Sequence, residues 1–198
     1  FNFTRNNDYL NYDKIIKDEE NKFNIIKKVL SFEHTSSSCT LFISKLLIKK
    51  SKFKFPVGKL YEDTASVYKL LFLTKNPLLI VNIFYFYRQR NNSITKTINK
   101  KTIDDIFSSI YCCISDVSSY KNELQPFIQG RISSLINGCL INIREKNCKK
   151  LLDYLLHQIN KLNNYYSISK STLFYWNSFL VSNFYFYNEL LLSKSRIY

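Results

Sequence analysis

Lysine side chains gather in one short stretch of this sequence, with no acidic residue among them. Residues 45–59 contain six lysines, and Phe53 and Phe55 lie between them. A mobile ammonium group can contact phosphate oxygens, and an aromatic ring can stack on an unpaired base. The stretch therefore has the residue types that an RNA-binding loop uses, although a single lysine cluster is more often a solvated surface.

Two further basic clusters follow along the chain. Residues 88–101 carry five cations and no acid, and residues 144–150 carry four cations with Glu145 as the only acid. Cations on separate loops of one compact domain can converge on a single face, which is what contact with a polyanion requires. The candidate RNA-binding residues of these clusters are Lys45, Lys49, Lys50, Lys52, Lys54, Arg88, Arg90, Lys96, Lys100, Lys101, Arg144, Lys146, Lys149 and Lys150.

Residues for catalysis are not evident in the sequence. Asp104 and Asp105 are adjacent, so their carboxylates point apart on a helix or a strand. His34 and His157 have no nearby serine, cysteine or aspartate in a recognisable nucleophile arrangement. We therefore predict that the protein is not an enzyme.

The five cysteines do not form a recognisable disulfide or metal pattern. Their number is odd, and Cys112 and Cys113 are adjacent. Cys139, Cys148 and His157 are spaced by nine residues, which places Cys148 on the opposite helix face from the other two. We expect reduced thiols, mostly in the core, with no metal and no cofactor.

Composition bounds the class of protein. The chain has 198 residues, a net charge of +14, only three glycines and three prolines, and no methionine. It is too apolar to be wholly disordered, and it lacks the glycines of a phosphate-binding loop. Its favoured residues, such as Phe, Ile, Asn, Lys and Tyr, have codons that A and T alone can write. Coding bias therefore inflates lysine and weakens the charge argument.

The spacing of apolar residues predicts a mainly α protein, a compact bundle of six to seven helices. Residues 103–117 fit either a strand or a helix. We divide the chain into an N-terminal extension with one helix, residues 1–36, and a helical RNA-binding domain, residues 37–198. The longest apolar run, residues 77–87, is shorter than the roughly 20 residues that cross a bilayer, so no membrane span is expected. The predicted helices cover residues 10–32, 41–48, 59–73, 76–88, 124–144, 151–162 and 172–192.

The order of these elements resembles that of the bacterial-type small-subunit ribosomal protein seven family. Residues 41–48 precede a lysine loop, and residues 74–78, Thr-Lys-Asn-Pro-Leu, match a Gly-Lys-Asn-Pro-Leu-like turn that opens the next helix. Residues 131–152 parallel the family's Arg-x-Ala-Leu-Ala-x-Arg-Trp helix and Ala-Arg-Lys-Arg turn, with Asn-Gly in place of Arg-Trp, and this match adds Arg131 to the candidate RNA-binding residues. Residues 109–117 resemble the returning strand of the family's hairpin, although both hairpin glycines are missing, so the resemblance implies a β-hairpin insertion at about residues 94–120. The resemblance covers about residues 37–190.

The resemblance implies a structural constituent of an organellar small ribosomal subunit. Members of the family bind the 3′ major domain of the small-subunit ribosomal RNA in the head, beside neighbouring head proteins. Their hairpin lies near the exit-site tRNA and the mRNA exit. The composition suits a divergent mitochondrial ribosome first and a plastid ribosome second.

A second hypothesis treats the lysines as coding bias. The chain would then be a helical accessory or adaptor subunit of an organellar membrane or respiratory complex that does not bind RNA. Its aromatic residues near the C-terminus would form the interface. The placement of the basic clusters on the folded surface is the feature that separates the two hypotheses.

Overall fold

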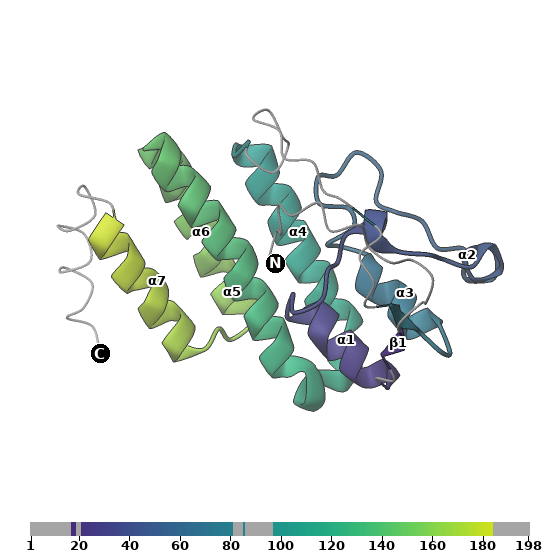
Figure 1. Cartoon of the computed structure of the whole chain (residues 1–198). Coiled ribbons are helices and arrows are strands. Elements are labelled where there is room, and N and C mark those ends of the chain that lie inside the picture. Colours follow the sequence, from purple (N-terminus) through teal and green to yellow (C-terminus); the bar gives the residue numbers. More distant parts are fainter. Residues whose placement is uncertain (1–16, 19–20, 81–84, 86–96, 184–198) are drawn as a thin grey trace, which may run out of the picture.

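The computed structural model describes residues 17–18, 21–80, 85 and 97–183. The described part is mainly helical, which confirms the predicted fold class, and Figure 1 shows its helices other than α2 (Lys45–Ser51) packed into a compact bundle, with α2 at its edge. Two short strands, β1 (Lys17–Asp18) and β2 (Leu79–Ile80), pair antiparallel. The helices are α1 (Lys22–Leu30), α2 (Lys45–Ser51), α3 (Val67–Leu73), α4 (Lys100–Asp116), α5 (Lys121–Lys146), α6 (Lys149–Tyr165) and α7 (Lys170–Asn183).

Helix α5 is the central element of the bundle. It packs against α1, α4, α6 and α7. Its side chains at Ile128, Ile132, Ile136, Leu140 and Ile143 are all buried. This spacing of three and four residues places one continuous apolar face along the helix, and it is the face that the sequence predicts.

Residues 100–116 form a helix, so the β-hairpin expected at residues 94–120 is wrong over this range. Its residues 94–96 lie outside the described part. Ile103, Ile106 and Ile110 are buried and recur at helical spacing, so the helix buries one apolar face against α5 and α6. Asn99 caps the helix, because its side chain accepts a hydrogen bond from the Thr102 backbone N–H at 2.9 Å. Packing has overridden the strand preference of the β-branched residues.

The segment after Asn76 also differs from its prediction as a helix. Leu79 and Ile80 form β2, paired with Asp18 and Lys17, and most of residues 81–88 lie outside the described part. The helix predicted at residues 10–32 is wrong at residues 17–18, which form β1, and its residues 10–16 and 19–20 lie outside the described part. Helix α3 begins at Val67, later than the predicted residue 59. The other helices begin and end within a few residues of prediction, except that residues 184–192 lie outside the described part.

Helix α1 belongs to the same hydrophobic core as α5. Ile26 and Leu30 are buried, and α1 packs against both α3 and α5. The predicted boundary at residue 36 thus separates α1 from the helices that it packs against.

Candidate nucleic-acid interface

The first basic cluster, here called the α2 lysines, comprises Lys45, Lys49, Lys50, Lys52 and Lys54. All five side chains are exposed, and none of them pairs with a carboxylate within the described residues. Helix α2 ends at Lys52, which takes a left-handed φ of 54°. The carbonyl groups at the end of the helix favour the nearby cations, so the cluster also has a local structural role.

Two rings lie among the α2 lysines. Phe53 and Phe55 meet edge to face, with ring centroids 5.1 Å apart. Phe55 packs against the core and anchors the loop. Phe42, just before α2, is 87% exposed. The stacking ring that the sequence placed at residues 53 and 55 is therefore only partly accessible, and Phe42 is the more open ring.

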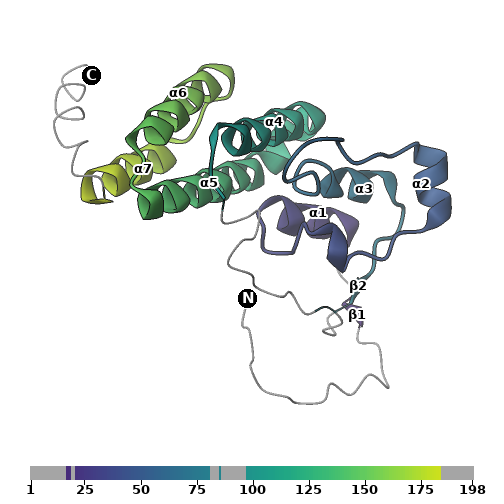
Figure 2. The same ribbon diagram turned by 90° about the horizontal axis from the view of Figure 1, so that it is seen from above.

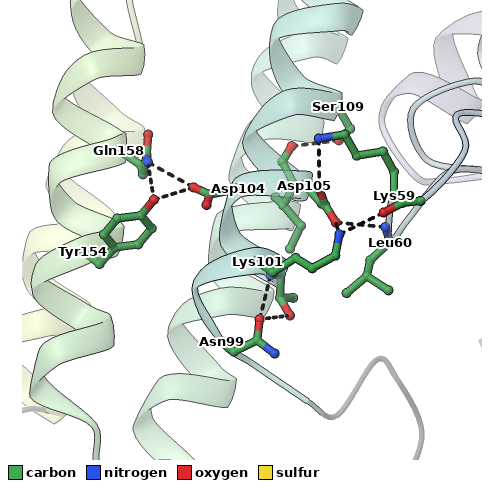
Figure 3. Close-up of polar contacts among 12 residues, drawn as sticks. Lys59, Leu60, Asn99, Lys101, Asp104, Asp105, Ser109, Tyr154 and Gln158 are labelled. Carbon is green, nitrogen blue, oxygen red and sulfur yellow. Dashed lines mark hydrogen bonds and ion pairs between the residues drawn. The ribbon is translucent and has the colours of Figure 1, made fainter.

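The second cluster is built around a buried carboxylate at the start of α4. The Asp105 side chain is only 3% exposed, and it forms ion pairs with Lys101 at 2.6 Å and Lys59 at 3.1 Å. It also accepts a hydrogen bond from the Leu60 backbone N–H at 3.0 Å, and Lys101 donates to the Gly58 carbonyl at 2.9 Å (Figure 3). These contacts fasten the loop before α3 to α4.

Burial by itself raises the pKa of Asp105, but the hydrogen bonds from Leu60, Lys101 and Lys59 outweigh it. The pKa of this carboxyl is therefore held below its usual value. Asp105 stays ionised, and it offsets part of the positive charge of the two lysines.

Asp104 points away from Asp105, as the sequence predicts for adjacent carboxylates. It accepts hydrogen bonds from the Tyr154 hydroxyl at 2.5 Å and from Gln158 at 3.2 Å, both on α6 (Figure 3). The Lys100 ammonium lies 5.1 Å from the centroid of the Tyr154 ring. The two carboxylates serve two separate structural contacts, and they form no shared acid–base site.

The third cluster lies at the turn between α5 and α6 and meets the second. Helix α5 ends at Asn147, whose φ of 45° turns the chain into α6. The Lys146 ammonium donates to the Ile98 carbonyl at 3.3 Å, directly before α4. Arg144 donates to Asn183 at 3.1 Å. Lys149 and Lys150 are exposed at the start of α6.

The exposed cations among the predicted RNA contacts that the structure describes thus form two groups. The start of α4 and the α5–α6 turn make one group, here called the turn cluster: Lys100, Lys101, Arg144, Lys146, Lys149 and Lys150. Figures 1 and 2 place α2 at the opposite edge of the molecule from α6 and α7. Lys59 and Leu60 connect the two groups, because the loop that leaves α2 returns to α4 at these residues.

Arg131 does not belong to this surface, and its prediction as an RNA contact is wrong. It is 1% exposed and donates to the backbone carbonyls of Val29 and Thr64. Its guanidinium carbon lies 4.5 Å from the Phe32 ring centroid, and burial lowers the pKa of the group. Arg131 joins α5 to α1 and to the turn before α3.

Three of the predicted RNA-binding residues, Arg88, Arg90 and Lys96, lie outside the described residues. Lys59 is one of the lysines of the first basic stretch, and no local signal in the sequence indicates its pairing with Asp105, which is distant in the chain. Within the described part, no three His, Cys, Asp or Glu side chains are placed to hold a metal ion, and no helix is long and apolar enough to cross a bilayer.

Comparisons of the chain with protein families, with curated proteins and with solved structures found no match. The resemblance to small-subunit ribosomal protein seven therefore stays a prediction.

Proposed function

We propose that this chain is a non-catalytic RNA-binding protein. The observation that carries the proposal is the meeting of two basic segments that lie far apart in the sequence. Lys146, at the end of α5, donates a hydrogen bond to the Ile98 carbonyl just before α4, so that the turn cluster forms at one end of the bundle. Cations assembled in this way can neutralise several phosphates of one strand.

The α2 lysines supply a second group of phosphate ligands. They are exposed and have no acidic partner within the described residues, whereas Asp105 offsets part of the charge of Lys101. Each lysine that approaches a phosphate releases condensed counterions, so binding weakens as salt rises. We therefore expect the α2 lysines to contribute more to affinity than Lys101.

In its finer form, the proposal places the protein in the small subunit of an organellar ribosome, mitochondrial or, failing that, plastid. Two segments support this form: α2 leads into the lysine loop, and residues 131–152 form a helix, a tight turn and a second helix. Both agree with the resemblance to ribosomal protein seven. The helical residues 100–116 and the buried Arg131 depart from it, so the proposed rRNA contact rests on the α2 lysines and the turn cluster.

The finer form is tested by purifying the tagged full-length protein from its native cells after ultraviolet crosslinking and sequencing the attached RNA. We expect fragments of the 3′ major domain of the small-subunit ribosomal RNA. Enrichment of other RNAs would contradict the ribosomal assignment alone. Recovery of no RNA above that of an unrelated tagged protein would contradict RNA binding altogether.

Two observations favour the alternative, a helical adaptor. The α2 lysines and the turn cluster lie at opposite edges of the molecule and share no single face, and α7 carries exposed rings. On α7, Phe174 is 74% exposed and Tyr175 is 54% exposed. Large exposed rings are typical of protein interfaces. In the same purification, an adaptor would retain its protein partners after RNase treatment, whereas an RNA-dependent assembly would release them.

A further inference from the structure

A cavity of about 210 Å³ lies beside the turn cluster, between α4, α5 and the loop before α3. Ile98, Ile106 and Leu135 give it an apolar lining. Ser134 and Asn142, on α5, add polar groups to the same wall. An apolar lining with a few polar groups is the usual character of a small-molecule site.

Gly138 keeps part of this space open. It lies inside α5, where glycine is less favourable than alanine by roughly 1 kcal/mol. A Cβ built on Gly138 would meet no atom within 4 Å, so close packing does not require a glycine there. Since Gly138 also lines the cavity, its missing side chain is volume that a ligand can use.

The polar wall has unused hydrogen-bonding capacity. Asn142 donates its amide N–H to the Gly138 carbonyl at 2.8 Å, which fixes the side chain, and its oxygen has no partner within the described residues. The Ser134 side chain is exposed and makes no hydrogen bond there either. Ser134 and Asn142 are eight residues apart on α5, about 12 Å along the helix axis, so one planar ring in the cavity can pair with either group but not with both.

The opposite wall is held in place before any ligand arrives. Tyr61 lines the cavity in a left-handed conformation with φ of 58°, which a non-glycine residue adopts only when its surroundings impose it. The preceding residues, Lys59 and Leu60, are both bonded to Asp105. The buried carboxylate thus fixes the loop that forms this wall.

A cation lies at the edge of the cavity. The Lys146 ammonium is 3.3 Å from the carbonyl oxygen of Ile98, which lines the cavity. A ligand with a flat ring in the cavity and an anionic group at its edge would therefore place that group near Lys146.

We infer that this cavity binds a single unpaired nucleobase whose phosphate lies on the turn cluster. The volume is below the 300–1,000 Å³ typical of drug-sized ligands, and it suits one ring system. Proteins commonly recognise unpaired RNA bases by taking them out of the stack into such sites. The inference rests on the proposed RNA binding and deepens it, and the nucleotide could belong to an RNA strand or be free in solution.

The test uses the full chain and two matched substitutions at one position. Gly138→Leu fills the cavity, whereas Gly138→Ala adds only a Cβ, and both replace glycine by a better helix former. Ser134→Leu fills the cavity from an exposed position and serves if Gly138→Leu does not fold, as judged by circular dichroism. The probes are single-stranded RNA of about twelve nucleotides, an RNA duplex of the same length, and uridine or adenosine monophosphate.

We expect the leucine variants to weaken single-stranded RNA binding about tenfold or more, the effect of losing one stacked base, and to leave duplex binding and the salt dependence unchanged. Gly138→Ala should bind like the wild type. A monophosphate that binds the wild type and not the leucine variants, without any change for RNA, would identify a free nucleotide as the source. Equal binding of every probe by wild type and leucine variants overturns the inference and leaves RNA binding standing, whereas no binding of any RNA by the wild type overturns both.

Discussion

Replacing Asp105 by asparagine removes the negative charge that pairs with Lys59 and Lys101 at the start of α4. The carboxylate is buried, and it holds Lys101, Lys59 and the Leu60 N–H at distances between 2.6 and 3.1 Å. Asparagine has nearly the same shape. Its oxygen can still accept the Leu60 N–H, but its amide nitrogen cannot accept from a lysine.

The size of the effect follows from the exposure of the partners. A hydrogen bond to a charged group contributes roughly 1.5–3 kcal/mol to stability. The Lys59 and Lys101 side chains are 44% and 57% exposed, so each returns to water at little cost, which reduces the loss. We expect Asp105→Asn to lower the free energy of unfolding by about 2 kcal/mol, and Asp105→Ala, which also leaves the Leu60 N–H unpaired, by about 3–4 kcal/mol.

The same contact predicts the dependence on pH. The pKa of Asp105 is lower in the folded protein than its ordinary value, so the folded state is stabilised by its ionisation. This contribution is fully present above the ordinary aspartate pKa of about 3.9, and it is lost as pH falls through the lower folded value. The stability difference between wild type and Asp105→Asn should therefore be constant from about pH 5 to 7 and shrink below about pH 4.

Urea denaturation followed by circular dichroism at several pH values measures both effects. Asp104→Asn is the matched control, since Asp104 is exposed on the other side of α4 and should leave the urea midpoint nearly unchanged. If Asp105→Asn were as stable as Asp104→Asn at pH 7, the buried carboxylate would not be the group that fastens the loop to α4.

Three further outcomes are expected. Arg131→Met should lower the free energy of unfolding by about 2–4 kcal/mol, because two buried carbonyls lose their donor, and RNA affinity of the folded protein should not change; urea titration and a binding assay measure these. Iodoacetamide at pH 8 should modify exposed Cys112 and spare Cys113, since burial raises the pKa of the Cys113 thiol to about 11; tandem mass spectrometry of the native protein distinguishes the two sites. The indole N–H of Trp176, the single tryptophan, donates to Asn137 at 2.9 Å. Asn137→Ala removes this acceptor and should lower the free energy of unfolding by about 1–2 kcal/mol, and fluorescence of the native protein should show a shift in tryptophan emission.

The sequence predicts most clearly those helices that bury one face, because their apolar residues recur every three or four positions. Helices α5 and α6 follow from apolar residues three and four apart, such as Ile132, Ile136 and Leu140. Helix α4 was ambiguous because its β-branched residues favour a strand locally, and only packing against α5 and α6 decides between the two. The strand at Leu79 and Ile80 depends on a partner, residues 17–18, that no local signal indicates.

The candidate site was predictable only in part for a similar reason. A run of lysines without acids indicates exposure, and the α2 lysines are exposed. Arg131 has the same charge but is buried. Its burial could not be predicted, because its acceptors, Val29 and Thr64, lie 102 and 67 residues away in the chain. The contact between Lys146 and Ile98 is likewise a property of the folded chain. Local sequence reports the charge of a residue, whereas tertiary packing decides whether a ligand can reach it.

The central claim is that the exposed lysines contact an RNA backbone, and the salt dependence of RNA affinity tests it most directly. The measurement compares the wild type with Lys49→Gln/Lys50→Gln/Lys54→Gln and with a control of equal charge change, Lys75→Gln/Lys161→Gln/Lys170→Gln, which alters exposed lysines outside both basic groups. For single-stranded RNA, the slope of log affinity against log salt should decrease in magnitude by about 0.7 for each lost phosphate contact, so by about 2 in the first variant, with little change in the control. Equal slopes for the two variants would show that net charge alone attracts RNA, and an undetectable affinity of the wild type at low salt would contradict the account as a whole.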